Sequence, residues 1–380
     1  MSVSYLDNAA TTPVRREVLE AMTPYLTSRF GNPSSHHTIG EQAAGALADA
    51  RKRVAAILGM RPTDVIFTSG ATEANNLALK GVAIAAQQRR GARHVVTTPI
   101  EHESVLGSVD YLTRIHGFDA TLVPVDTTGL VDPDAVAAAI RDDTAIVSVG
   151  YANNEIGTVQ DVAGLVAAVA GRVPLHLDAV QAAGWLPLAG LGADALSIAG
   201  HKIGAPKGIG ALGIRSRIPL EPVLHGGGQE RDRRSGTENV AGAVGLARAL
   251  ELAEAERADA AERVSGMRDD LISGVLERVP NARLTGHPEH RLPGTASFTF
   301  SGVNGETVLL ELERRGIVTS SGSACAAGSE EASHVLLALG IDHDEARTAV
   351  RVTLGQGATG SVAPVVDAIE AAVAAVGSGV

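Results

Sequence analysis

The chain has 380 residues, of which 45% are hydrophobic and 20% charged, and its formal net charge is −11. A chain of this size and composition can bury a large core in one large or two ordinary domains, while its acidic balance argues against a general binder of nucleic acid or anionic membranes. It has no apolar run near the length of about 18 residues that marks a transmembrane helix, no secretory signal and a single cysteine, so we expect a cytoplasmic protein.

Strand-like and helix-like segments alternate up to about residue 240. Short β-branched runs predict strands at 65–68, 94–97, 120–125, 145–149, 175–177 and 195–198. Ala-rich helical patterns lie between many of them, for example over 72–88 and 161–170. Repeated strand–helix units predict an α/β fold with a mainly parallel sheet covered by helices, in which ligands bind beyond the carboxyl ends of the strands.

A different pattern follows. A long helix rich in Ala, Glu and Arg is predicted over 240–278, and then strands and helices at 295–300, 306–315, 316–318 and 362–376. This order is typical of a smaller α+β domain. We therefore expect a large domain over 16–256 and a small domain formed by 1–15 together with 257–380.

The segment from Thr68 to Glu73 joins a predicted strand to a predicted helix. Gly70 permits a tight turn, the N–H groups of the first helical turn suit a phosphate, and Thr72 adds a hydroxyl. Thr72 equally suits an ordinary N-cap, and taken alone this structural interpretation is preferred.

Asp178 and His102 each follow a predicted strand. A carboxylate at the end of a buried strand needs a cationic partner, such as the protonated ring nitrogen of pyridoxal phosphate, although Asp178 could also cap the next helix. His102 could stack on a planar ring or transfer protons, although a lone histidine is more often structural.

Lys202 ends the segment Gly200-His201-Lys202 after the strand predicted at 195–198. Small neighbours limit its solvation, which makes it a Schiff-base candidate, whereas Lys52, Lys80 and Lys207 are interpreted as helix-surface or loop residues. A phosphate turn, a histidine, an acid and a lysine thus occur in the order that a pyridoxal phosphate site needs.

Cys325 is the only cysteine, and it lies in a stretch of Ser, Gly and Ala over 320–328. Such a stretch can hardly pack a core and suits a thiol that is exposed and moves. It cannot form an internal disulfide, and no CxxC pair for a metal is present. A chance loop cysteine is the alternative interpretation.

Together these motifs resemble the cysteine desulfurases of the NifS/IscS kind, which belong to the class V aminotransferase group of pyridoxal phosphate enzymes. The matching strings are YLDNAATTP (5–13), GNPSS (31–35), FTSGATE (67–73), NNEIG (153–157), GHK (200–202), RSGT (234–237) and SGSAC (321–325). The resemblance implies the pyridoxal phosphate-dependent transferase fold of type I, and it spans nearly the whole chain.

The resemblance also implies how each residue contacts the cofactor. Lys202 would carry pyridoxal phosphate as a Schiff base, Asp178 would pair with the ring nitrogen, Gln181 would bond the phenolic oxygen, and His102 would stack on the ring and help move protons. The residues implied to hold the phosphate are Ala71, Thr72, His201 and, from the other subunit of a homodimer, Thr237.

For the substrate, the resemblance implies that Asn154 and Arg351 hold the carboxylate of L-cysteine. The Cys325 thiolate would attack the substrate sulfur, leaving a persulfide on the enzyme and releasing L-alanine. The sulfur would pass to an acceptor or scaffold protein for iron–sulfur clusters or another sulfur cofactor. No metal site is expected from this chain alone, although Cys325 could transiently ligate an iron–sulfur cluster.

Two positions depart from the family pattern. Ala199 replaces a serine that commonly contacts the phosphate, and Gln356 replaces an arginine near the site. The alternatives within the fold are a selenocysteine lyase or a class V aminotransferase, although a transaminase has no use for Cys325. A non-enzymatic pyridoxal-binding or scaffold protein is a third alternative, which the intact set Lys202, Asp178, His102 and Cys325 disfavours.

Overall fold

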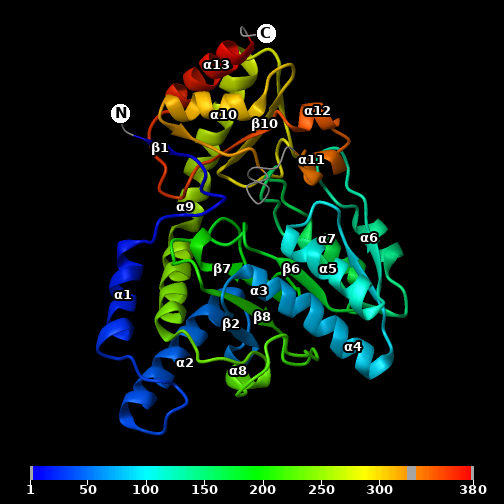
Figure 1. The fold of residues 1–380 in the computed structure, drawn as a ribbon, viewed down its shortest axis with the longest axis vertical. Helices are drawn as coiled ribbons and strands as arrows, with labels where there is room; N and C mark the ends of the chain where they lie inside the picture. The colour runs from blue at the N-terminus through cyan, green and yellow to red at the C-terminus, as the bar shows by residue number, and fades with distance from the viewer. Residues whose placement is uncertain (1–2, 323–330, 378–380) are drawn as a thin grey trace.

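The structure, a computed structural model, describes residues 3–322 and 331–377. A seven-stranded sheet forms its largest layer, with the strand order β2-β8-β7-β6-β5-β3-β4 (Figure 1). Its strands are β2 (Val65–Thr68), β3 (His94–Thr97), β4 (Asp119–Leu122), β5 (Thr144–Gly150), β6 (Leu175–Asp178), β7 (Ala195–Ala199) and β8 (Gly210–Ile214).

The sheet is parallel over β7, β6, β5, β3 and β4, as the alternating pattern predicts. β8 is the exception, since it runs antiparallel to both of its neighbours, β7 and β2. Its sequence, GALGI, has little β-branched content, which is why the pattern predicted no strand there. Gly210 is needed at this point because a Cβ would lie 2.7 Å from the carbonyl carbon of Gly70 in the turn after β2.

Helices cover both faces of this sheet (Figure 1). One face packs against α1 (Arg16–Thr27), α2 (Thr38–Leu58), α6 (Pro133–Ala139), α7 (Val162–Val169) and the first part of α9 (Val240–Arg278). The other face packs against α3 (Ala71–Asn76), α4 (Val82–Arg90) and α5 (Glu103–His116). Alternate residues of one strand enter opposite cores: Val147 of β5 lies in the first and Ile146 in the second.

A second, smaller core surrounds an antiparallel sheet with the order β12-β10-β9. Its strands are β9 (Ala282–Leu284), β10 (Thr295–Phe300) and β12 (Val350–Thr353), and its helices are α10 (Gly305–Arg314), α13 (Ala363–Gly377) and the last part of α9. The N-terminal strand β1 (Ser4–Tyr5) pairs in parallel with β11 (Ile317–Val318). α9 runs through both cores, so the predicted domain boundary at 256/257 falls inside one helix and stays a prediction.

The remaining short elements are η1 (Pro62–Asp64), η2 (Leu77–Gly81), η3 (Gly200–Lys202), α8 (Gln229–Asp232), α11 (His334–Ala338) and α12 (His343–Ala346). The π-helical η2 joins α3 to α4, so the chain is helical from Ala71 to Arg90. Among the described helices, none combines the length and apolar character needed to cross a bilayer.

The predicted bounds are confirmed for the long helix 240–278 and for the strands 65–68, 94–97 and 295–300. The strand predicted at 120–125 is shorter and ends at Leu122. Pro124 explains the early end, because it has no N–H to continue the ladder with β3.

Candidate active site

A cavity of about 710 Å³ opens at the carboxyl ends of the parallel strands. Its wall includes most of the residues predicted from the sequence: Ala71, Thr72, His102, Asn154, Asp178, Gln181, His201, Lys202 and Arg351. Thr237 is not part of this wall, and Cys325 lies outside the described residues. Gly322 and Glu331, the nearest described residues on either side of Cys325, both line the cavity.

The turn between β2 and α3 supplies one end of the cavity. Gly70 precedes the helix with φ +155°, and it is the N-cap residue. Thr72 therefore lies inside the first helical turn, and the interpretation of Thr72 as an N-cap is wrong. Because the helical run continues to Arg90, the N–H groups of Ala71 and Thr72 form the positive end of a long helix that faces the cavity.

His201 lies at this end as well, beside two lysines. Burial, and then the charges of Lys202 and Lys207, lower the pKa of His201 to about 4, so its ring is neutral at physiological pH. Its Nδ1 lies 3.2 Å from Oγ1 of Thr11. Lys207 lies in an exposed turn, as predicted, and it also lines the cavity.

Asp178 ends β6 and is 9% exposed. Its Oδ1 accepts the N–H of Val180 at 3.0 Å, and its Oδ2 accepts Nδ2 of Asn75 at 2.7 Å. The first of these bonds closes a turn after β6, and no helix begins there, so the interpretation of Asp178 as a helix cap is wrong. Both bonds fix the carboxylate at the cavity wall in an orientation that a cationic ring nitrogen could meet.

Lys202 ends the 3-10 turn η3 directly after β7. Its Nζ donates to the carbonyl oxygen of Ala10 at 2.8 Å and also to that of Ala9. The amide of Gln181 donates to the Ala9 oxygen as well, at 3.0 Å. The N-terminal segment thus holds both side chains at the cavity, and Thr12 fastens it there through a 2.9 Å bond to the His201 carbonyl.

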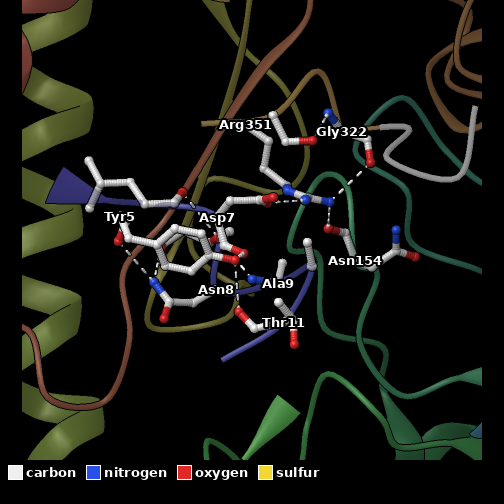
Figure 2. Close-up of polar contacts among 12 residues, drawn as sticks. Tyr5, Asp7, Asn8, Ala9, Thr11, Asn154, Gly322 and Arg351 are labelled. Carbon is white, nitrogen blue, oxygen red and sulfur yellow. Dashed lines mark hydrogen bonds and ion pairs between the residues drawn. The ribbon is translucent and has the colours of Figure 1, made fainter. Parts of the chain in front are cut away.

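Arg351, on β12, is only 1% exposed and is surrounded by acceptors (Figure 2). Nη2 donates to Oδ1 of Asp7 at 2.7 Å, and Nη1 donates to the carbonyl oxygens of Asn154 at 2.8 Å and Gly322 at 3.0 Å. Its Nε is buried with no partner among the described residues. Arg351 is therefore paired with Asp7, and Asn154 contributes its backbone to it.

Two buried carboxyl groups beside the predicted residues were missed by the sequence analysis. Glu101 is 3% exposed, and burial raises its pKa to about 7, although Thr98 Oγ1, which donates to it at 2.6 Å, opposes the rise. Burial also raises the pKa of Glu155, whose Oε2 accepts the Ser333 hydroxyl at 2.5 Å. Glu101 directly precedes His102, and Glu155 directly follows Asn154. This adjacency to predicted site residues was the sequence signal that could have indicated them.

The two departures from the family pattern have different positions. Ala199 lines the cavity, where its methyl group offers no hydrogen bond. Gln356 does not line this cavity, and its Nε2 donates to the carbonyl oxygens of Ala253, at 3.2 Å, and Gly184. Gln356 thus links the second core to the first by neutral hydrogen bonds.

Comparison with known proteins identifies the family. The sequence model of the family "Aminotransferase class-V" matches residues 4–361. The cysteine desulfurase IscS of Methanosarcina thermophila is 46% identical over 355 residues, which cover 93% of this chain and 87% of that protein. The IscS-like cysteine desulfurase of Mycobacterium tuberculosis is 45% identical over 363 residues, which cover 93% of this chain and 91% of that protein.

Among solved structures, a NifS-like protein matches with a TM-score of 0.88 at 37% identity, over 100% of this chain and 99% of its own. The chain belongs to the class-V aminotransferase family. Within that family it groups with the cysteine desulfurases of the NifS/IscS kind, so the predicted fold type and the resemblance seen in the sequence are confirmed.

Proposed function

We propose that the chain is a pyridoxal phosphate-dependent cysteine desulfurase that converts L-cysteine to L-alanine and takes the sulfur as a persulfide on Cys325. The observation that carries the proposal is the composition of one cavity wall. It brings a lysine amine, a strand-end carboxylate and a buried arginine together with Gly322 and Glu331, which flank the cysteine segment in sequence.

The residues present fit pyridoxal phosphate. The start of α3 offers N–H groups to a phosphate, and a Cβ on Gly70 would meet nothing within 4 Å, so the turn leaves room beside it. Asp178 would pair with a protonated ring nitrogen, and Lys202 would supply the covalent link. The bound cofactor supplies the sink for the electron pair left when the substrate α-proton is removed.

The chain's own residues would perform the remaining tasks. Arg351 would bind the substrate carboxylate, Lys202 would remove the α-proton, and His102 would act at the same cavity. The Cys325 thiolate would attack the substrate sulfur, and the Cβ–S bond would break with its electron pair going to carbon. Protonation of that carbon, and return of a proton to the α-carbon, would yield alanine, and the sulfur would remain on Cys325 for transfer to an acceptor.

We also propose a homodimer in which Thr237 of each subunit reaches the phosphate of the other. Thr237 lies outside the wall of its own cavity, although Arg234 pairs with Glu73 of α3 at 2.8 Å. On either side of it, Arg233 Nη1 and Glu238 Oε2 are buried without a partner among the described residues. Atoms that are already buried in one chain are not open to a second chain, so the dimer proposal rests on the position of Thr237 outside its own cavity wall.

The natural acceptor of the sulfur is proposed to be a carrier or iron–sulfur scaffold protein in the cytoplasm. The acidic net charge of −11 favours a protein partner over nucleic acid or an anionic membrane.

The decisive experiment compares the wild-type chain with Cys325→Ser. The wild type, given L-cysteine and a reductant without a keto acid, should release alanine and sulfide, and mass spectrometry should find one added sulfur on the peptide that contains Cys325. Cys325→Ser should bind the cofactor normally and release no sulfide, because a hydroxyl is a far weaker nucleophile than a thiolate. Full sulfide production by this variant would reject the proposal, and a strict need for a keto acid would favour an aminotransferase.

A further inference from the structure

A continuous set of hydrogen bonds connects Asp178 to His102 behind the cavity wall. Nδ2 of Asn75 donates both to Oδ2 of Asp178, at 2.7 Å, and to Oγ of Ser104, at 2.9 Å. Oγ of Ser104 lies 2.8 Å from Nδ1 of His102. The backbone N–H of Ser104 also points to that nitrogen, at 3.0 Å, because His102 is the N-cap of α5.

The direction of each bond follows from donor and acceptor chemistry. An ionised carboxylate only accepts, so the amide nitrogen of Asn75 faces Asp178 and, through its second hydrogen, Ser104. The Asn75 side chain is held in this orientation even though its Oδ1 is buried without a partner among the described residues. Asn75 is 1% exposed, so solvent does not replace these bonds.

The Ser104 hydroxyl accepts from Asn75 and keeps its own proton for Nδ1 of His102. The backbone N–H of Ser104 can only donate, so Nδ1 must be an acceptor whatever the orientation of the hydroxyl. A neutral imidazole with an acceptor Nδ1 carries its proton on Nε2.

We infer that Ser104 and Asn75 are positioning residues that hold His102 in the Nε2–H tautomer, so that the ring enters the reaction as a hydrogen-bond donor. The ring has no nitrogen left to accept a proton while Nδ1 is engaged. The catalytic consequence of this tautomer rests on the proposed function. In that function Lys202 is the base, and His102 polarises the reacting atoms as a neutral imidazole does in other enzymes. The tautomer itself does not depend on that function.

Nitrogen NMR of the full chain labelled with ¹⁵N-histidine tests the tautomer directly. A ring nitrogen without a proton resonates far downfield of a protonated one, and His102→Gln identifies the His102 signals among those of the 12 histidines. We expect Nδ1 to be the downfield nitrogen. If Nε2 is the downfield nitrogen, the inference is overturned, whether or not the chain acts on cysteine.

Two matched variants test the role of Ser104. Ser104→Ala removes the hydroxyl that faces Nδ1 and should shift the Nδ1 resonance further downfield, because a nitrogen lone pair with fewer donors is less shielded. Ser108→Ala removes a buried hydroxyl one turn along the same helix, which donates to the Ser104 carbonyl at 2.7 Å, and should leave the His102 resonances in place. Unchanged His102 resonances in Ser104→Ala, or equal shifts in both variants, would refute the positioning role.

The same pair of variants gives a kinetic readout. Ser104→Ala should lower kcat about fivefold to tenfold with little change in KM, which is the effect of one hydrogen bond lost behind a catalytic group. Ser108→Ala should stay near the wild-type kcat. A loss of cofactor binding in Ser104→Ala instead of a lower kcat would show a structural role and contradict the inference.

Discussion

Replacing Glu101 with Gln is expected to stabilise the folded chain at neutral and alkaline pH and to have little effect in acid. Burial raises the pKa of Glu101 from 4.5 to about 7, since the side chain is 3% exposed beside the carboxylate of Asp178. The ionised form is therefore disfavoured in the folded chain relative to the unfolded chain. Gln has the same shape and no charge.

The size of the effect follows from the two pKa values. The interval from 4.5 to about 7 corresponds to a free energy of about 3 kcal/mol between the two protonation states. Below pH 4.5 both folded and unfolded chains carry the proton, so Glu101 costs no stability. Between these values only the unfolded chain releases it, so stability falls as the pH rises, and above about 7 the full cost is present.

The hydrogen bonds at this position tolerate the amide. Glu101 accepts from the Thr98 hydroxyl and from the Gly150 N–H. Gln can present its oxygen to Gly150 and its NH₂ to the Thr98 oxygen, since a hydroxyl both donates and accepts. The substitution therefore removes the charge and keeps one hydrogen bond to each of the two partners.

Urea unfolding at a series of pH values from acid to alkaline measures the difference, with equal chain concentration and no cofactor so that mass action does not contribute. Glu101→Gln should match the wild type near pH 4.5 and exceed it by about 3 kcal/mol above about pH 7. Glu277→Gln, at an exposed carboxylate of α9, is the control and should show no such trend. A difference that stays constant with pH would refute the reasoning.

Three further predictions concern the cavity. Borohydride reduction followed by peptide mapping should place a pyridoxyl group on Lys202, and a label on another lysine would contradict the assignment. Asp178→Asn should weaken cofactor binding and slow exchange of the substrate α-proton by at least about tenfold, because a neutral amide does not hold the ring nitrogen protonated; exchange at the wild-type rate would show that the acid is elsewhere. Asp7→Asn should lower the KM for L-cysteine, because Arg351 loses its competing carboxylate, and an unchanged KM would mean that the Arg351–Asp7 pair is not opened by substrate.

The sequence predicted the parts of the site that depend on strand ends. Asp178 ends one short buried strand and Lys202 comes shortly after another, and parallel strands bring their carboxyl ends to one edge. β8 was not predicted because its sequence, GALGI, has little strand character. The position of β8 depends on the close approach of Gly210 to Gly70. That approach involves two segments that are distant in sequence, so neither segment alone predicts it.

The hydrogen bonds behind the cavity wall could not be predicted from the sequence for the same reason. Asn75 lies on α3 and Ser104 on α5, and only the packing of these helices on one face of the sheet joins them. A single asparagine within a helix is normally read as a surface or capping residue. The raised pKa of Glu101 likewise depends on how deeply the segment after β3 is buried, and the composition of this segment does not predict its burial.

Arg351 shows what the long-range pairing adds to function. The resemblance named it as a carboxylate ligand, yet the structure pairs it with Asp7, 344 residues away in sequence. An arginine that is 1% exposed and lacked a counter-charge would cost several kcal/mol, so Asp7 stabilises the fold when no substrate is present. If Arg351 binds the substrate carboxylate as proposed, that carboxylate would exchange with Asp7, and its affinity would be the difference between two similar ion pairs. Such an exchange would make binding moderate and release easy, which would suit a site that must be emptied of alanine in every turnover.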